Sequence, residues 1–157
     1  MSNGADNITI IVDTREKNPL DLSKHGIDTV VGTLKYGDYS MKYPSLQKHV
    51  AVERKSLDDF LMCCGRERER FEKELTGLRG IKYSMILCEF RYEEIFSDMS
   101  RSRINRNAVA MSIARWQMQG HNIQFSGNRE MSTVCLVSYF KVIAKDIYSF
   151  AKQCVEV

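Results

Sequence analysis

Two acidic residues and a lysine in the first half of the chain have the types and spacing needed for metal-assisted chemistry on a phosphate. Glu53 and Lys55 are two residues apart in the run Val50–Ser56. Successive side chains of a strand alternate between its faces, so both should project from the same face. Asp38 lies on an earlier apolar and aromatic run. If the two runs pair, the carboxylates come together in a site that suits phosphodiester hydrolysis.

Such a site is expected to use Mg²⁺ or Mn²⁺. These ions prefer oxygen ligands, and Mg²⁺ typically takes one or two protein carboxylates and keeps several waters. We expect Asp38 and Glu53 to be the carboxylate ligands, with the main-chain carbonyl of Arg54 as a third oxygen. Lys55 would orient or help to deprotonate the attacking water and offset the charge that builds on the phosphorus.

A second acidic pair lies at the end of another predicted strand. Asp13 and Glu16 follow the β-branched run Ile8–Val12, and functional groups often collect at the carboxyl ends of strands in open sheets. They could bind the metal through water or hold a second ion. An alternative applies to Glu53 and Lys55, because an acidic and a basic residue at this spacing often form a surface ion pair that contributes little.

The hydrophobic pattern predicts an α/β fold with a central mixed sheet flanked by helices. Ser56 is a typical residue for the amino-terminal cap of a helix. We expect strands at 8–13, 27–34, 36–42, 49–54 and 83–88, a short strand at 122–125, and helices near 56–64, 66–78, 105–119 and 132–154.

Three short motifs carry the chemistry: Asp-Thr-Arg-Glu at 13–16, Gly-Asp-Tyr at 37–39, and Val-Glu-Arg-Lys-Ser at 52–56 followed by Asp58 and Asp59. Together they resemble the GD…ERK…D signature of the nuclease domain of XPF-type structure-selective DNA endonucleases, which has a restriction-endonuclease-like fold. Residues 65–71 resemble the arginine-bearing helix of that family, and residues 86–89 resemble its apolar strand that ends in a glutamate.

This resemblance implies a Mg²⁺- or Mn²⁺-dependent endonuclease that cuts branched DNA, such as flaps, forks or nicked junctions, in repair or recombination. It also implies roles for single residues. Asp13, Asp38, Glu53 and Lys55 match the catalytic positions of the family, Glu16 and Arg54 match signature residues with less defined roles, and Arg66 matches the arginine of the following helix.

Arginines are the expected DNA contacts. The net charge of +3 permits a nucleic-acid partner, and residues 100–129 contain no Asp or Glu. For Arg66 and Arg70 there are two interpretations, since interleaved glutamates could pair with them on a solvated helix face. The resemblance favours the other interpretation, in which they face phosphate. The basic segment should bind phosphates in a salt-dependent way through Arg101, Arg103 and Arg106.

We expect residues 1–7 to be disordered and residues 8–157 to form a single nuclease domain without the helix-hairpin-helix domain that usually follows in this family. Either the chain is part of a longer protein, or it is a stand-alone nuclease. The amino terminus lacks the pattern of a signal peptide, so an intracellular location is expected, in the cytoplasm or the nucleus.

The last predicted helix carries a regular apolar seam. One interpretation is that the seam packs on the sheet of its own domain, and the alternative is a homodimer or partner-subunit interface. The seam consists of Leu136, Phe140, Ile143, Ile147, Phe150 and Cys154.

Two alternatives to a branch-cutting endonuclease remain open at this point. One is a catalytically silent DNA-binding or scaffold module of the same fold, although such partners usually lose the acidic and lysine positions that are present here. The other is a different enzyme of the restriction fold, such as a junction resolvase. The geometry of its preferred substrate would distinguish it from a branch-cutting endonuclease.

Overall fold

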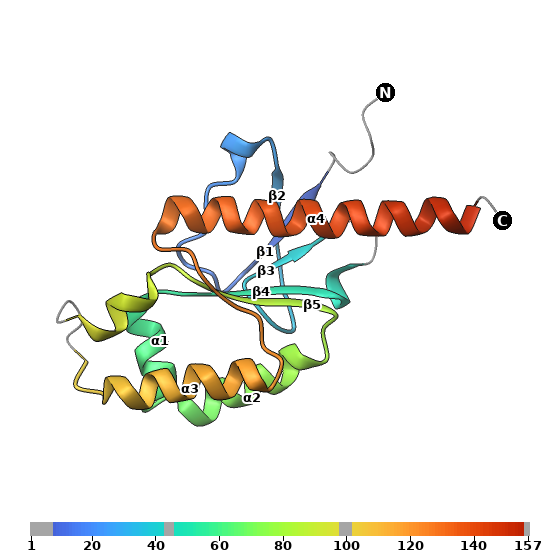
Figure 1. The fold of residues 1–157 in the computed structure, drawn as a ribbon. Helices are drawn as coiled ribbons and strands as arrows, with labels where there is room; N and C mark the ends of the chain where they lie inside the picture. Colours follow the sequence, from blue (N-terminus) through green and yellow to red (C-terminus); the bar gives the residue numbers. More distant parts are fainter. Residues whose placement is uncertain (1–7, 43–45, 98–101, 156–157) are drawn as a thin grey trace.

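A computed structural model describes residues 8–42, 46–97 and 102–155, so the predicted disordered segment 1–7 lies outside the described residues. Within these ranges, one sheet of six strands has the order β2-β1-β3-β4-β5-β6 (Figure 1). No helix in the described ranges combines the length and the apolar character needed to cross a membrane. The strands are β1 (Thr9–Asp13), β2 (Asp28–Gly32), β3 (Tyr39–Met41), β4 (Val50–Lys55), β5 (Tyr83–Cys88) and β6 (Ile123–Phe125), and the helices are α1 (Leu57–Cys64), α2 (Arg68–Arg79), α3 (Arg106–Met118) and α4 (Arg129–Val155), with short 3₁₀ turns at Ser23–His25, Leu46–Lys48 and Tyr92–Phe96.

The sheet is mixed, which confirms the predicted α/β class. Strand β3 runs antiparallel to both of its neighbours, β1 and β4. The outer pairs β1 with β2, β4 with β5, and β5 with β6 are parallel. Helix α4 covers one face of the sheet, and α1, α2 and α3 cover the other (Figure 1).

Alternation along β4 divides its side chains between these two layers. Val50 and Val52 belong to the apolar core beneath α4. Ala51 belongs to the second core, beneath α1, α2 and α3. Because side chains alternate along a strand, Glu53 and Lys55 follow Ala51 toward the three-helix side, and Arg54 follows the valines toward α4. One strand therefore supplies charged groups to both faces of the sheet.

Several predicted boundaries are wrong, and local hydrogen bonds explain each difference. The third strand begins at Tyr39 rather than at residue 36, because a bend with Gly37 in the left-handed region precedes it. The second strand ends at Gly32. Beyond that point, the backbone N–H of Leu34 donates to the Asp13 carboxylate rather than to a neighbouring strand.

The helix starts differ from the prediction too. Helix α2 begins at Arg68 rather than at 66, after a turn in which the Glu67 N–H donates to the Met62 carbonyl. Helix α4 begins at Arg129 rather than at 132. Its cap is Asn128, whose side-chain oxygen accepts the Met131 N–H at 2.8 Å. The predicted cap at Ser56 is confirmed, since its hydroxyl accepts the N–H of Asp59.

The apolar seam of α4 divides into two parts. Leu136, Phe140 and Ile143 are buried in the core of their own domain, as the packing interpretation expects. Phe150 is 69% exposed and Cys154 is exposed, and the last turns of α4 project beyond the sheet (Figure 1). For these turns, the dimer or partner alternative stays a prediction.

Gly37 gives a first testable prediction, because its φ of 79° disfavours any residue with a side chain. A Cβ there would also lie 3.0 Å from the Val52 carbonyl oxygen and 3.2 Å from the Val52 nitrogen. We expect Gly37→Ala to lower the free energy of unfolding by about 2–3 kcal/mol, measured by urea denaturation.

The matched control is Gly26→Ala. Gly26 has a similar φ of 67°, but a Cβ there would meet nothing within 4 Å. This variant should lose only the cost of the left-handed conformation, about 1 kcal/mol. Equal losses in the two variants would contradict a role for the close approach of Gly37 to β4.

Candidate active site

Asp38 and Glu53 meet as the sequence predicts, because β3 pairs with β4 through Tyr39 and Val52. The Asp38 N–H donates to the Val52 carbonyl at 2.8 Å. The Asp38 Oδ2 accepts the backbone N–H of Arg54, also at 2.8 Å. These two hydrogen bonds fix both the backbone and the carboxylate of Asp38 to β4, beside Glu53.

Burial and mutual repulsion make these two carboxylates hard to ionise. Burial, followed by the negative charge of Glu53, raises the pKa of Asp38 from 3.8 to about 7. Burial also raises the pKa of Glu53, although the neighbouring Lys55 opposes this shift. Two desolvated carboxylates that repel each other favour either a bound proton or a bound cation.

Lys55 lies against Glu53, as alternation on β4 predicts. Its Nζ is 2.7 Å from the Glu53 Oε1, and the exposed fractions of the two side chains are 11% and 13%. This pair is therefore not the solvated surface pair of the alternative interpretation. Burial alone would lower the pKa of Lys55, but the charge and hydrogen bond of Glu53, together with smaller contributions from Cys63 and Glu74, raise it. The ammonium group thus stays protonated near neutral pH.

The Asp13 carboxylate is buried and accepts hydrogen bonds from Arg15 and from the backbone. Its Oδ1 accepts the Arg15 Nε–H at 2.6 Å and the Arg15 backbone N–H at 2.9 Å, and its Oδ2 accepts the Leu34 N–H at 2.7 Å. Burial would raise the pKa of Asp13, but these hydrogen bonds together lower it. The arrangement favours a role in positioning Arg15, and metal binding by Asp13 stays a prediction.

Glu16 is engaged by Arg54 on the α4 side of the sheet. The Arg54 guanidinium donates to both Glu16 oxygens, at 2.8 and 2.9 Å, and to the Glu89 Oε2 at 2.9 Å. The Glu89 Oε1 lies 3.3 Å from the Arg129 Nη1. These four residues form a chain of alternating charges across the sheet and the start of α4. A role for Glu16 in positioning Arg54 fits these contacts better than metal binding.

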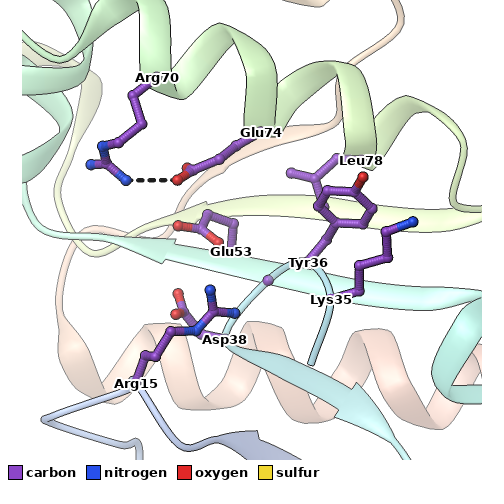
Figure 2. Close-up of a pocket in the computed structure, with 9 residues that line it drawn as sticks. Arg15, Lys35, Tyr36, Asp38, Glu53, Arg70, Glu74 and Leu78 are labelled. Carbon is purple, nitrogen blue, oxygen red and sulfur yellow. Dashed lines mark hydrogen bonds and ion pairs between the residues drawn. The ribbon is translucent and has the colours of Figure 1, made fainter. Parts of the chain in front are cut away.

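Two hollows meet at the paired carboxylates. The first, with a volume of about 180 Å³, lies between the Gly37 bend and α2. The second, of about 460 Å³, extends toward Lys55, Asp59 and Glu89. Arg15, Asp38 and Glu53 line both. Figure 2 shows the first hollow, with Arg70 and Glu74 of α2 above Glu53, and with Arg15 beside Asp38.

The contacts of Arg70 fit both interpretations of this helix face, namely ion pairing with glutamates and phosphate binding. It donates to the Glu67 Oε2 at 2.9 Å and to the Glu74 Oε1 at 2.7 Å, as the ion-paired alternative expects. It also lines the first hollow, as a phosphate contact would. Arg66, in the turn before α2, lies on the surface, where its guanidinium contacts the Met62 sulfur.

The remaining predicted DNA contacts precede or begin α3. Arg101 lies outside the described residues, and Arg103 is exposed. Arg106 folds back and donates to the Ser102 carbonyl at 2.9 Å, so part of its guanidinium is not available to a ligand. The segment lies near Arg66, because a Cβ on Gly65 would be 3.2 Å from the Ile104 Cδ1.

The predicted site residues do not include several that line the first hollow, and Arg15 and Glu74 are the two charged ones nearest to the carboxylates (Figure 2). Arg15 belongs to the Asp-Thr-Arg-Glu motif, and its two-residue spacing from Asp13 is the signal that the two side chains lie together. The turn after β1 places the Arg15 guanidinium against the Asp13 carboxylate. In the sequence, Glu74 is one of the glutamates interleaved with arginines, a pattern that predicts only a solvated helix face. Its position four residues after Arg70 was the available signal.

The donor set fits a hard cation that keeps part of its water shell. Among the described residues, no three His, Cys, Asp or Glu side chains are grouped as a ready metal cage. Mg²⁺ seldom uses such cages and is usually held by one or two carboxylates. Asp38 and Glu53 are two desolvated carboxylates with raised pKa, which matches that requirement.

The raised pKa of Asp38 predicts how stability depends on pH. Its folded-state pKa of about 7 exceeds the ordinary value of 3.8, so the folded state keeps a proton that the unfolded state releases. The contribution of Asp38 to stability is therefore fully present below about pH 4 and is lost as pH rises through 7. In EDTA at pH 8, Asp38→Asn should therefore stabilise the protein, by on the order of 1–3 kcal/mol, measured by urea denaturation.

At pH 4.5 the gain should be much smaller, because the native Asp38 is then largely protonated. The control is Asp28→Asn on the exposed edge strand β2, which should change stability little at either pH. An Asp38→Asn variant that is less stable than the native protein at pH 8 would contradict the repulsion between the two carboxylates.

The comparisons with known proteins agree with this geometry. Residues 12–139 match the profile of the ERCC4 domain family. The fold is similar to that of XPF from Aeropyrum pernix, with a TM-score of 0.71 and 17% identity over 92% of this chain and 69% of that chain. A second similar structure is XPF from Aeropyrum pernix in complex with DNA, with a TM-score of 0.70 and 19% identity over 89% of this chain and 66% of that chain. No curated protein sequence matches this chain.

The structural likeness confirms the predicted restriction-endonuclease-like fold. The family profile spans both hollows and the paired carboxylates, from the end of β1 to the middle of α4. This chain therefore belongs to the ERCC4 domain family.

Proposed function

We propose that this protein is a metal-dependent endonuclease that hydrolyses phosphodiester bonds in branched DNA, such as flaps, forks or junctions, during repair or recombination. The observation that carries the proposal is the pairing of Asp38 and Glu53, two partly desolvated carboxylates, beside the buried ammonium of Lys55. Membership of the ERCC4 domain family and the likeness to a DNA-bound XPF support it.

Asp38 and Glu53 would hold Mg²⁺ or Mn²⁺, with the main-chain carbonyl of Arg54 as a further oxygen donor. When bound, such an ion activates water near neutral pH and offsets charge on the phosphoryl oxygens. Asp13 would act mainly by holding Arg15, and Glu16 by holding Arg54. The residues that would contact the ion thus depend on β4 and on the bend at Gly37.

Lys55 would act as a cation rather than as a base. Its raised pKa keeps the ammonium protonated. In that state it can donate a hydrogen bond to the attacking water or to a phosphoryl oxygen, and it stabilises negative charge that develops in the transition state. The pair with Glu53 fixes its position at 2.7 Å.

The DNA backbone would pass over the paired carboxylates, between two sets of arginines. Arg15 and Arg70 line the first hollow and can meet phosphates near the cleaved bond. Arg66 and Arg103 lie at the corner between α1, α2 and the start of α3, where they can meet a more distant phosphate. Such contacts fix position without reading sequence.

A catalytically silent DNA-binding module is the second candidate. Retention of Asp38, Glu53 and Lys55 in one site favours the enzyme. A junction resolvase of the same fold is the third candidate, and it differs from the first in the substrate that it prefers.

Cleavage of a labelled 3′-flap DNA in Mn²⁺ tests the enzyme directly. The native protein should cut near the branch, whereas Asp38→Asn and Lys55→Ala should each cut at least about 100-fold more slowly, because they remove a metal ligand or the stabilising cation. Both variants should still bind the flap within a few fold of the native affinity.

A linear duplex and a four-way junction serve as comparison substrates in that assay. Faster cutting of the junction than of the flap would favour a resolvase. If the folded native protein binds the flap but cuts none of these substrates, the silent module is the better description.

Arg103→Glu should weaken binding to flap and duplex DNA alike, by about 5-fold at moderate salt. It should also reduce the slope of log affinity against log salt by about 1, because one phosphate contact is lost. The control is Lys73→Glu, on the exposed side of α2, which should bind normally. An unchanged affinity and salt slope for Arg103→Glu would mean that DNA does not cross this corner.

A further inference from the structure

Glu74 lies on the α2 wall of the first hollow, above Glu53 (Figure 2). The ion pair of Glu69 with Lys73, on the same helix, points to solvent. The exposed fraction of the side chain is 88% for Glu69, which pairs with Lys73, and 33% for Glu74. Glu74 thus differs from Glu69 in lining a hollow, together with its partner Arg70.

The two carboxylate oxygens of Glu74 are used unequally. Its Oε1 accepts a hydrogen bond from the Arg70 Nη1 at 2.7 Å. Its Oε2 is buried and has no hydrogen-bond partner among the described residues. A buried, unpartnered carboxylate oxygen is costly, and in native structures it often marks the place of a water or an ion.

The space in front of Glu74 suits a hydrated ion. The first hollow has a volume of about 180 Å³, which is enough for several waters. The negative charge of Glu74 also influences the proposed site, because it raises the pKa of both Glu53 and Lys55. At the same time, no three carboxylates form a ready cage among the described residues, so direct coordination by Glu74 is not favoured.

We propose that Glu74 is a positioning residue of the same site: its Oε2 accepts a hydrogen bond from a water on the divalent cation that Asp38 and Glu53 hold, while its Oε1 keeps Arg70 at the mouth of the hollow. This inference rests on the proposed function. It adds a carboxylate from α2 to a site otherwise built on β4 and the Gly37 bend.

The test is Mn²⁺ binding to the metal-free protein without DNA, measured by electron paramagnetic resonance of free Mn²⁺ and by calorimetry. Glu74→Gln preserves the shape of the side chain and removes its charge. It should weaken Mn²⁺ binding about 10-fold, because residues that orient metal-bound groups typically contribute 10- to 100-fold. Glu69→Gln makes the same charge change on the same helix and should stay within 2-fold of the native affinity.

Arg70→Gln distinguishes the role of the Glu74 Oε1, which holds Arg70, from the role of the Oε2. If Glu74 acted only by holding Arg70, this variant would weaken Mn²⁺ binding as much as Glu74→Gln does. We expect no weakening, since the substitution removes a positive charge near the cation. Equal losses in the two variants would overturn the proposed water contact.

Asp38→Asn distinguishes failure of this inference from failure of the proposed function. If Asp38→Asn abolishes Mn²⁺ binding while Glu74→Gln binds like the native protein, the role of Glu74 is refuted and the metal site stands. If the native protein does not bind Mn²⁺ at millimolar concentration, both proposals are refuted. Circular dichroism and urea denaturation of each variant confirm that the fold is kept.

Discussion

The hydrogen bond from the Arg54 N–H to the Asp38 carboxylate is the contact on which the rest of the site depends. It joins a residue outside the strands to the backbone of β4, where alternation sends Glu53 and Lys55 to one face and Arg54 to the other. The left-handed bend at Gly37 makes this approach possible. The two faces therefore cannot shift independently, because adjacent residues of one strand serve both.

The site concentrates like charges at a cost to stability. Burial raises the pKa of both Asp38 and Glu53, and a neighbouring negative charge adds to the rise, that of Glu53 at Asp38 and that of Glu74 at Glu53. Such strain is common where a protein must bind a cation, because the same repulsion that destabilises the empty fold strengthens the attraction for the ion. Lys55 relieves part of this cost through its contact with the Glu53 Oε1.

Sequence patterns predicted the sheet class, the Ser56 cap and the meeting of Asp38 with Glu53, since these follow from alternation and local capping. They did not predict contacts that depend on how separate elements pack. Glu16 and Arg54 are 38 residues apart and meet only because β1 and β4 lie near each other in the sheet. Glu74 resembled any solvated helix glutamate, and only the close packing of α2 over β4 reveals its buried oxygen.

Arg129 ties the start of α4 to the loop after β1 through hydrogen bonds to the carbonyls of Asn18 and Pro19, and to Glu89 through an ion pair. Glu89 in turn holds Arg54. Helix α4 has 27 residues, so it extends about 40 Å from this anchored end. Because Leu136, Phe140 and Ile143 also hold the helix on the sheet, a single element connects the charged residues behind Glu53 and Lys55 to the exposed turns at the far end of α4.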